Sequence, residues 1–284
     1  MDKIAILTDT GADMDRSLSE KFGIYLISFY MNIEGNFTKE IDIKPDEFYK
    51  ELKTMEKFPK TSIPSPGELM DMFEKIKKDG YDKLLIVTIS NKLSGFNNLC
   101  NSLKDYDGLD IKIVDTKNIA LAAGMVAIYA SELVKQGLNF DKIYEKIEKL
   151  KKKSQVFFTI DTLKYLKAGG RIGRVSGSIA EILSIKPIIS CDTEEGVYYV
   201  VKKCRGEKKL MKSFIETVKE KIEGTKKYYL AISHGDNHEG FQKLQEELKD
   251  EINNAEKFFH SQINPTLAAN TGPGLIGVGV FEID

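Results

Sequence analysis

Two groups of hydroxyl side chains stand where the chain is expected to turn from a strand into a helix. The first lies in residues 61–68, TSIPSPGE, where Ser65 is a favourable N-cap and Glu68 completes the spacing of a capping box. The start of a helix offers unpaired N–H groups and a partial positive charge. Because Thr61 and Ser62 precede it, this stretch is predicted to hold a small anion such as a carboxylate or a phosphate. The alternative is that Ser65 only caps its own helix.

The second hydroxyl is Ser94, which follows a predicted strand at residues 83–89 and precedes apolar residues at helical spacing. Ser94 or a near neighbour is predicted to cap the next helix. As a nucleophile, Ser94 would need a base, and only the fold could bring His234 or His260 near it. Its Leu-Ser-Gly context differs from the G-x-S-x-G elbow of hydrolases. A serine-dependent acyl hydrolase or acyltransferase using Ser94 is therefore the alternative to a binding role.

Few side chains in the sequence suit a metal ion or a nucleotide. His234 and His238 are four residues apart, but Gly235 favours a loop there and no third ligand is nearby. Residues 270–275, NTGPGL, lack the Gly-Lys-Ser/Thr ending of a phosphate-binding loop, and Pro273 removes one backbone donor. We therefore predict no metal site and no cofactor.

Strands that alternate with helices position these residues in the first half of the chain. The predicted strands are residues 3–8, 24–32, 83–89 and 111–115, with a polar excursion at 34–44. Helices are predicted around residues 14–21, from Pro45, from Ser65 to Gly80, after Ser94, through an alanine-rich segment ending near Gly137, and after Asn139. This alternation favours a parallel sheet over roughly the first 150 residues.

The second half mixes hairpin and crossover signals. Predicted strands are residues 155–160, 187–190, 197–203, 228–233, around 258–259, and 276–283. Helices are predicted at residues 161–167, through Ile179, Ile182 and Leu183, at 210–222, and at 241–252. The pattern predicts a mixed-sheet α/β domain. With a lysine-rich boundary near 149–154, we expect an N-terminal domain at residues 1–152 and a C-terminal domain at 153–284.

Composition narrows the class of protein. The chain has 284 residues, 42% of them hydrophobic and 30% charged, and a net charge of −1, which argues against a nucleic-acid surface or a polybasic membrane anchor. The longest apolar run, residues 119–130, is too short to span a bilayer, and the N-terminus is expected to be a strand and not a leader. Three dispersed cysteines predict no disulfide framework. We expect a cytoplasmic protein, with a monomer as the default.

Six short motifs occur in order along nearly the whole chain. They are TDTGAD at residues 8–13, TSIPSP at 61–66, LSG at 93–95, LKYL with GGRI at 163–172, IKPI at 185–188, and TGPG at 271–274. Any one of these motifs is weak, but six in this order are specific. Together they resemble the DegV family of bacterial fatty-acid-binding proteins.

The resemblance implies a two-domain α/β fold that holds a long-chain fatty acid in an apolar tunnel, with the carboxylate at the domain interface. It also implies that Thr61 and Ser94 contact the head group and that Arg171 lies near it, although Arg171 alone would be interpreted as a helix cap. The predicted ligand-binding residues are Thr61, Ser62, Ser94, Gly95, Arg171, Asn270, Thr271 and Gly272, and no catalytic residue is predicted.

Some members of that family present the carboxylate to a separate ATP-binding fatty acid kinase, and the acyl phosphate then enters phospholipid synthesis. A chain of this kind would carry the substrate without being the catalyst. The sequence departs from the family at one position, since Asn270 stands where the family commonly has a histidine before TGPG. Asparagine forms hydrogen bonds but supplies neither a proton nor a positive charge. We therefore expect fatty acid binding to survive this difference better than the handling of an acyl phosphate.

Overall fold

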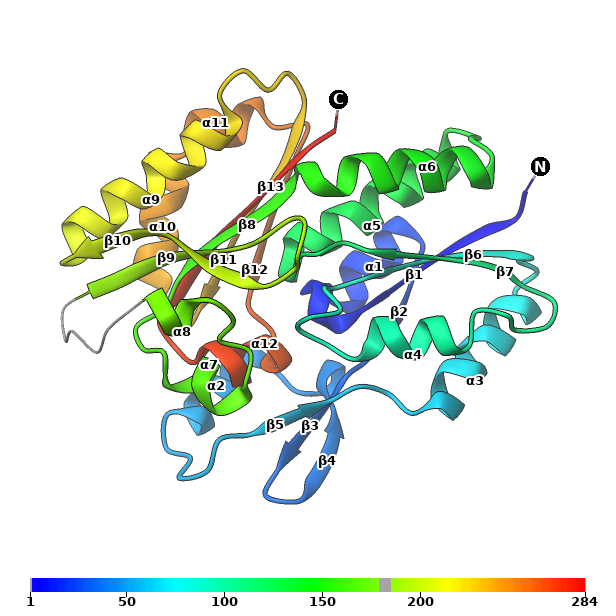
Figure 1. Cartoon of the computed structure of the whole chain (residues 1–284), viewed down its shortest axis with the longest axis horizontal. Helices are drawn as coiled ribbons and strands as arrows, with labels where there is room; N and C mark the ends of the chain where they lie inside the picture. Colours follow the sequence, from blue (N-terminus) through cyan, green and yellow to red (C-terminus); the bar gives the residue numbers. More distant parts are fainter. Residues whose placement is uncertain (1, 179–184, 284) are drawn as a thin grey trace.

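Helix α5 (Ala120–Lys135) lies between two β-sheets and packs against strands of both (Figure 1). The computed structural model describes residues 2–178 and 185–283 of the chain. Residues 120–131 of α5 are all buried. A helix that is apolar all round belongs in a protein interior, so α5 forms the shared centre of the fold.

One sheet is parallel and has the strand order β2-β1-β6-β7, where β1 is Ile4–Asp9, β2 is Ile24–Ile27, β6 is Lys83–Thr88 and β7 is Asp110–Asp115. Alternate residues of these strands face opposite sides. Leu7 and Ile86 join the core under α3 (Pro66–Lys78) and α4 (Phe96–Ser102). Ile6 and Leu85 join the core under α5 and α6 (Phe140–Leu150). A sheet covered on both faces in this way needs the near-continuous apolar strands that the sequence has.

The other sheet is mixed and has the order β10-β9-β8-β13-β11-β12. Its strands are β8 (Ser154–Thr159), β9 (Ile185–Cys191), β10 (Tyr198–Arg205), β11 (Tyr228–Gly235), β12 (Lys257–Gln262) and β13 (Leu275–Glu282). β11 and β12 pair in parallel, and the other neighbours pair antiparallel. Phe157 packs in the core under α9 (Glu207–Ile222), whereas Phe158 faces the opposite side, towards the first sheet. The predicted α/β class with one parallel and one mixed sheet is confirmed.

A small third sheet corrects one prediction. Residues 24–32 were expected to form a single strand, but β2 ends at Ile27 and β3 (Tyr30–Ile33) belongs to an antiparallel sheet with β4 (Asn36–Lys39) and β5 (Lys60–Ser62). The chain leaves the parallel sheet at Phe29, whose N–H donates to Thr10 Oγ1 at 3.0 Å. The predicted polar excursion at 34–44 therefore contains a strand, β4.

Two helices differ from the expectation. No helix was predicted over residues 265–271, but Asn270 and Thr271 lie in the last turn of α12 (Pro265–Thr271), where Asn264 is the N-cap and Pro265 the first residue. This start is the cap-then-proline pattern that opens many helices. The helix predicted over 241–252 is divided into α10 (His238–Glu247) and α11 (Lys249–Asn254).

Three more helices match their predicted places, namely α1 (Arg16–Phe22), α2 (Pro45–Leu52) and α7 (Lys164–Gly169). The structure also has α8 (Val175–Ser178) and 3-10 helices at Thr10–Ala12, Glu40–Asp42 and Lys151–Lys153, which were not predicted. The helix expected through Ile179, Ile182 and Leu183 lies outside the described residues. Among the residues that are described, no helix combines the length and the apolar character needed to cross a membrane. The chain passes from one sheet to the other between β7 and β8, and the division at residue 152 stays a prediction.

Candidate functional site

The structure brings seven of the eight predicted ligand-binding residues to one pocket between the two halves of the chain. The pocket holds about 860 Å³ of space not filled by atoms, including its open side. Its lining includes Thr61, Ser62, Ser94, Gly95, Arg171, Asn270 and Thr271. Gly272 lies outside this lining. Its φ of +75° and the Tyr165 ring, which a Cβ would approach to 2.3 Å, require a glycine there for packing. We call this pocket the mouth.

Thr61 lies on β5, where it pairs with Met31 of β3. The hydroxyls of Thr61 and Ser62 have no hydrogen-bond partner in the part of the chain that the structure describes, so both can donate to a ligand. Ser65 behaves differently. Its Oγ accepts from Glu68 N–H at 3.2 Å, and the Glu68 carboxylate accepts from Ser65 N–H at 3.0 Å.

The predicted capping box is therefore confirmed, and the anion site predicted in residues 61–68 stays a prediction. Of residues 61–68, Thr61, Ser62 and Ile63 line the mouth and residues 64–68 do not. The start of α4 also lines the mouth, through Ser94 and Gly95. Ser94 Oγ accepts from Phe96 N–H at 3.2 Å, which leaves its proton free for a ligand.

Arg171 connects the two halves of the chain at the mouth. Its Nε donates to the carbonyl of Leu93 at 3.3 Å, and its Nη1 donates to the carbonyl of Gly169. The first bond reaches the residue before Ser94, and the second closes the end of α7. Arg171 thus caps a helix and also lines the mouth, and its Nη2 has no hydrogen-bond partner within residues 2–178 and 185–283.

Asn270 and Thr271 line the mouth, but both use polar groups for hydrogen bonds within their own helix. Asn270 Nδ2 donates to the carbonyl of Thr266 at 3.0 Å, and Thr271 Oγ1 donates to that of Leu267 at 3.0 Å. Asn270 Oδ1 lies against Gly169, where an added Cβ would come within 2.2 Å of it. These contacts fix the end of α12 against α7 more than they offer donors to a ligand.

Two further polar residues line the mouth and were not predicted from the sequence, Tyr198 and Thr266. Both are buried, and neither hydroxyl has a hydrogen-bond partner among the described residues. Burial raises the pKa of the Tyr198 hydroxyl, which keeps it a neutral donor. Tyr198 was predicted only as part of a strand, and nothing in its sequence neighbours marks the side chain as facing a pocket.

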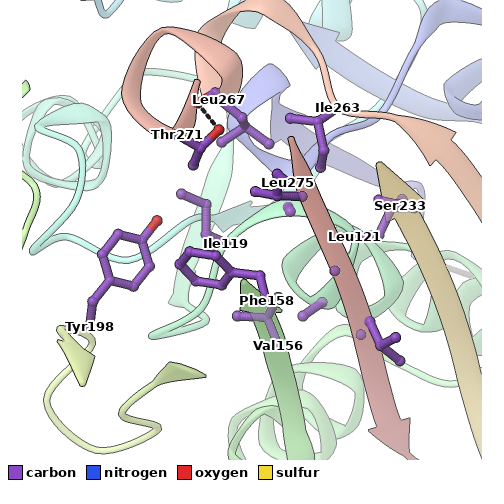
Figure 2. A pocket seen from close by; sticks show the side chains of 15 residues that line it. Ile119, Leu121, Val156, Phe158, Tyr198, Ser233, Ile263, Leu267, Thr271 and Leu275 are labelled. Atoms are coloured by element: carbon purple, nitrogen blue, oxygen red, sulfur yellow. Dashed lines mark hydrogen bonds between the residues drawn. The ribbon is translucent and has the colours of Figure 1, made fainter. Parts of the chain in front are cut away.

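An apolar cavity continues inward from the mouth. It contains about 450 Å³ of space not filled by atoms, including space open to solvent, and its lining is almost entirely aliphatic or aromatic (Figure 2). Ile119, Tyr198, Leu267 and Thr271 line both the cavity and the mouth. The polar pocket and the apolar cavity are therefore neighbours that share a boundary, with Phe158 packed edge-on against the Tyr198 ring at 5.3 Å between centroids.

Two glycines of β13 shape the cavity, and they do so differently. A Cβ on Gly279 would lie 3.3 Å from the backbone N of Ala122, so this glycine lets α5 approach the sheet. A Cβ on Gly277 would meet only ordinary contacts, the closest at 3.5 Å from Phe157 O and Phe158 Cβ. The missing side chain of Gly277 therefore leaves space that belongs to the cavity.

Three carboxyl groups outside the mouth and the cavity are buried. Burial raises the pKa of Asp9 and of Asp13 to about 7, and that of Glu40 to about 8. Asp9 accepts from Gly11 N–H at 2.9 Å and from Ile89 N–H at 3.2 Å, which ties the ends of β1 and β6 together. These acids are structural connections behind the site, since none of them lines the mouth or the cavity.

Neither alternative chemistry gains a site from the geometry. Ser94 has no hydrogen bond to a histidine or a carboxylate within the described residues. The rings of His234 and His238 lie 4.6 Å apart between centroids, but the described part of the chain contains no group of three side chains able to hold a metal ion.

Comparison with known proteins places the chain in a family. The family model described as an uncharacterised protein of the DegV family matches residues 3–282. The chain belongs to the DegV family. A DegV domain-containing protein of Clostridium acetobutylicum is 36% identical over 284 residues, which cover 99% of this chain and 100% of the relative. The resemblance drawn from the six motifs is thus confirmed.

Solved DegV structures have the same fold. A DegV family protein of Thermus thermophilus, described by its fatty acid binding, is similar with a TM-score of 0.90 and 26% identity over 99% of each chain. A fatty-acid-binding DegV family protein of Streptococcus agalactiae is similar with a TM-score of 0.89 and 29% identity over 100% of each chain.

Proposed function

We propose that this DegV family protein binds a long-chain fatty acid, with the carboxylate at the mouth and the tail in the apolar cavity. The observation that carries the proposal is the shared boundary, where Ile119, Tyr198, Leu267 and Thr271 line both spaces. A ligand that fits both must have one polar end and a long apolar remainder. The solved DegV proteins described as fatty-acid-binding, from Thermus thermophilus and Streptococcus agalactiae, support the same ligand class.

The two spaces contribute unequally to affinity. Each buried methylene is worth about 0.8 kcal/mol, so about fifteen methylenes gain on the order of 12 kcal/mol before the costs of association. A hydrogen bond to a charged group adds about 1.5–3 kcal/mol when it is shielded from water. The tail therefore supplies most of the affinity, and the hydroxyls of Thr61 and Ser94 orient the carboxylate.

The mouth suits a ligand that must be passed on. Its open side leaves the carboxylate within reach of another protein, and the Arg171 guanidinium already donates to two backbone carbonyls. We extend the proposal to a carrier role, in which a separate ATP-binding fatty acid kinase phosphorylates the bound acid. Thr61, Ser94 and Arg171 are then the head-group residues, and the chain itself breaks no bond.

Ligand analysis tests the binding proposal. Native mass spectrometry of the purified protein should show one non-covalent fatty acid per chain, which is removed by delipidation and restored by adding palmitate. A covalent adduct on Ser94, or ester hydrolysis lost in Ser94→Ala, would contradict the proposal and favour the hydrolase. For the carrier role, the loaded protein should yield acyl phosphate when ATP and the fatty acid kinase of the same organism are added. If none of these kinases produces acyl phosphate, the protein binds fatty acid but does not have the carrier role.

A further inference from the structure

A groove on the surface lies behind the apolar cavity. It contains about 690 Å³ of space not filled by atoms, including open solvent. Its lining comes from three places in the fold: the segment around α1, the first turn of α5, and β12. Asp13, Leu18, Leu121, Phe259 and Ser261 are among its lining residues.

A single layer of side chains separates this groove from the cavity. Leu121 lines both spaces. Ser233 lines the cavity and Ser261 lines the groove, and their Oγ atoms are hydrogen-bonded at 2.8 Å. We call Leu121, Ser233 and Ser261 the partition.

The partition is held firmly from both sides. Ser261 Oγ donates to Asp13 Oδ2 at 2.6 Å, and Asp13 Oδ1 accepts from Asn264 N–H at 3.0 Å. On the helix side, Ser154 Oγ donates to the carbonyl of Ala122 at 2.6 Å, which ties the first turn of α5 to β8. An acyl tail cannot push these groups apart without leaving buried polar atoms unpaired, and that is costly in an apolar surrounding.

The partition stands on the side of the cavity away from the mouth. Tyr198, which also lines the mouth, and Ser233, which does not, lie at opposite sides of the cavity in Figure 2. A tail that enters past Tyr198 therefore points its methyl end towards the partition.

We infer that the partition sets the longest acyl chain that this protein can hold, and that Leu121 is the residue that determines this limit. The inference rests on the proposed function, because it assigns the methyl end of the same ligand. Beyond the partition the groove is open to solvent, so removing the Leu121 side chain would join the cavity to the groove and give a longer tail a path outward.

The test is a chain-length profile of affinity. Delipidated wild-type protein is titrated by calorimetry with saturated fatty acids of about 12 to about 22 carbons. Affinity should rise about fourfold for each added methylene while the tail stays within the cavity, and should stop rising once the methyl end reaches the partition. A wild-type protein that binds none of these acids would refute the proposed function itself.

Variants then locate the limit. Leu121→Ala removes three carbons, so affinity should keep rising with chain length for two or three methylenes beyond the wild-type limit. The longest acid bound should then have roughly tenfold or more higher affinity for the variant than for wild type. Leu121→Val removes one carbon and is less disruptive to folding, and it should shift the limit in the same direction by about one methylene. Leu133→Ala is the matched control, because Leu133 is also buried on α5 but lines neither the cavity nor the groove.

The outcomes separate the two claims. A longer limit in both Leu121 variants, with wild-type behaviour in Leu133→Ala, supports the inference. If wild type binds fatty acids but Leu121→Val keeps its limit, or Leu133→Ala shifts it equally, the partition does not set the chain length and the inference is wrong, although the proposed function stands.

Discussion

The mouth and the apolar cavity share four residues but are built by opposite means. The mouth collects side chains from β5, the start of α4, the end of α7 and α12, and several of its hydroxyls, among them that of Thr61, have no partner in the described part of the chain. The cavity is lined almost entirely by apolar side chains, and Gly277 of β13 adds no side chain to it. The difference teaches that orientation and affinity are controlled by separate residues, which can be changed one at a time.

Filling the cavity should have the largest effect. Gly277→Leu places about four carbons where the tail lies, so we expect a loss of about 3 kcal/mol, roughly 100-fold in affinity for palmitate by calorimetry. Gly277→Ala adds one carbon at a site with only ordinary contacts and should cost about fourfold. Equal affinity in wild type and Gly277→Leu would show that the tail lies elsewhere.

Changes at the mouth should have an intermediate effect. Thr61→Val and Ser94→Ala each remove one hydroxyl from the carboxylate, and we expect each to weaken palmitate binding by about 1–2 kcal/mol, roughly five- to thirtyfold. Ser65→Ala is the matched control, because the Ser65 hydroxyl serves the cap of α3 and lies outside the mouth. It should lower stability by about 1 kcal/mol and leave affinity unchanged. Affinity lost in Ser65→Ala but kept in Thr61→Val would reverse the assignment.

The buried carboxyl group of Glu40 should affect stability without affecting affinity. Glu40 has a pKa of 4.5 as an ordinary glutamate and about 8 when folded, so the folded protein binds more protons between these values. The free energy of unfolding therefore falls as the pH rises from about 5 to about 8, because the buried carboxyl group resists losing its proton. Glu40→Gln cannot titrate, and its stability in urea should fall less over this range than that of wild type.

The exposed Glu47 on α2 provides the comparison for Glu40. Glu47→Gln should keep the wild-type dependence on pH, since Glu47 is largely open to solvent. Palmitate affinity at pH 7 should be the same in both variants. A steeper loss of stability with pH in Glu40→Gln would contradict the account of the buried carboxyl.

The smallest expected effect is at Asn270. Its amide already donates to Thr266 O, so Asn270→His should change palmitate affinity by less than about threefold. In contrast, if a positive charge at residue 270 helps to hold the acyl phosphate, Asn270→His should raise the rate of acyl phosphate formation with a kinase. A tenfold gain in palmitate affinity would show that residue 270 contributes to holding the carboxylate.

The sequence predicted the parts of this site that lie in regular, locally encoded structure. Alternating strands and helices gave the two sheets, and the capping box at Ser65 is a local signal that the structure confirms. Thr61 and Ser62, upstream of that box, line the mouth whereas the box itself does not, because spacing along the chain does not reveal which residues near a helix start face a pocket. Tyr198 and Gly277 were missed for a similar reason, since only the register of the mixed sheet decides which strand face lines the cavity.

The partition was equally invisible in the sequence. Leu121 lies in a helix that is buried on every side, so no periodic pattern distinguishes the face that lines the cavity. Ser233 and Ser261 meet only because β11 and β12 pair in parallel with these two residues in register. Contacts of this kind come from tertiary pairing, which local propensity does not encode.

A crystal structure of the delipidated protein reloaded with palmitate tests the central claim most directly. We predict density for one carboxylate within hydrogen-bond distance of the Thr61 and Ser94 hydroxyls, with the tail passing Tyr198 and running alongside Gly277 towards Leu121. Palmitate with its carboxylate at the Ser233 end, or bound outside the cavity altogether, would contradict the account.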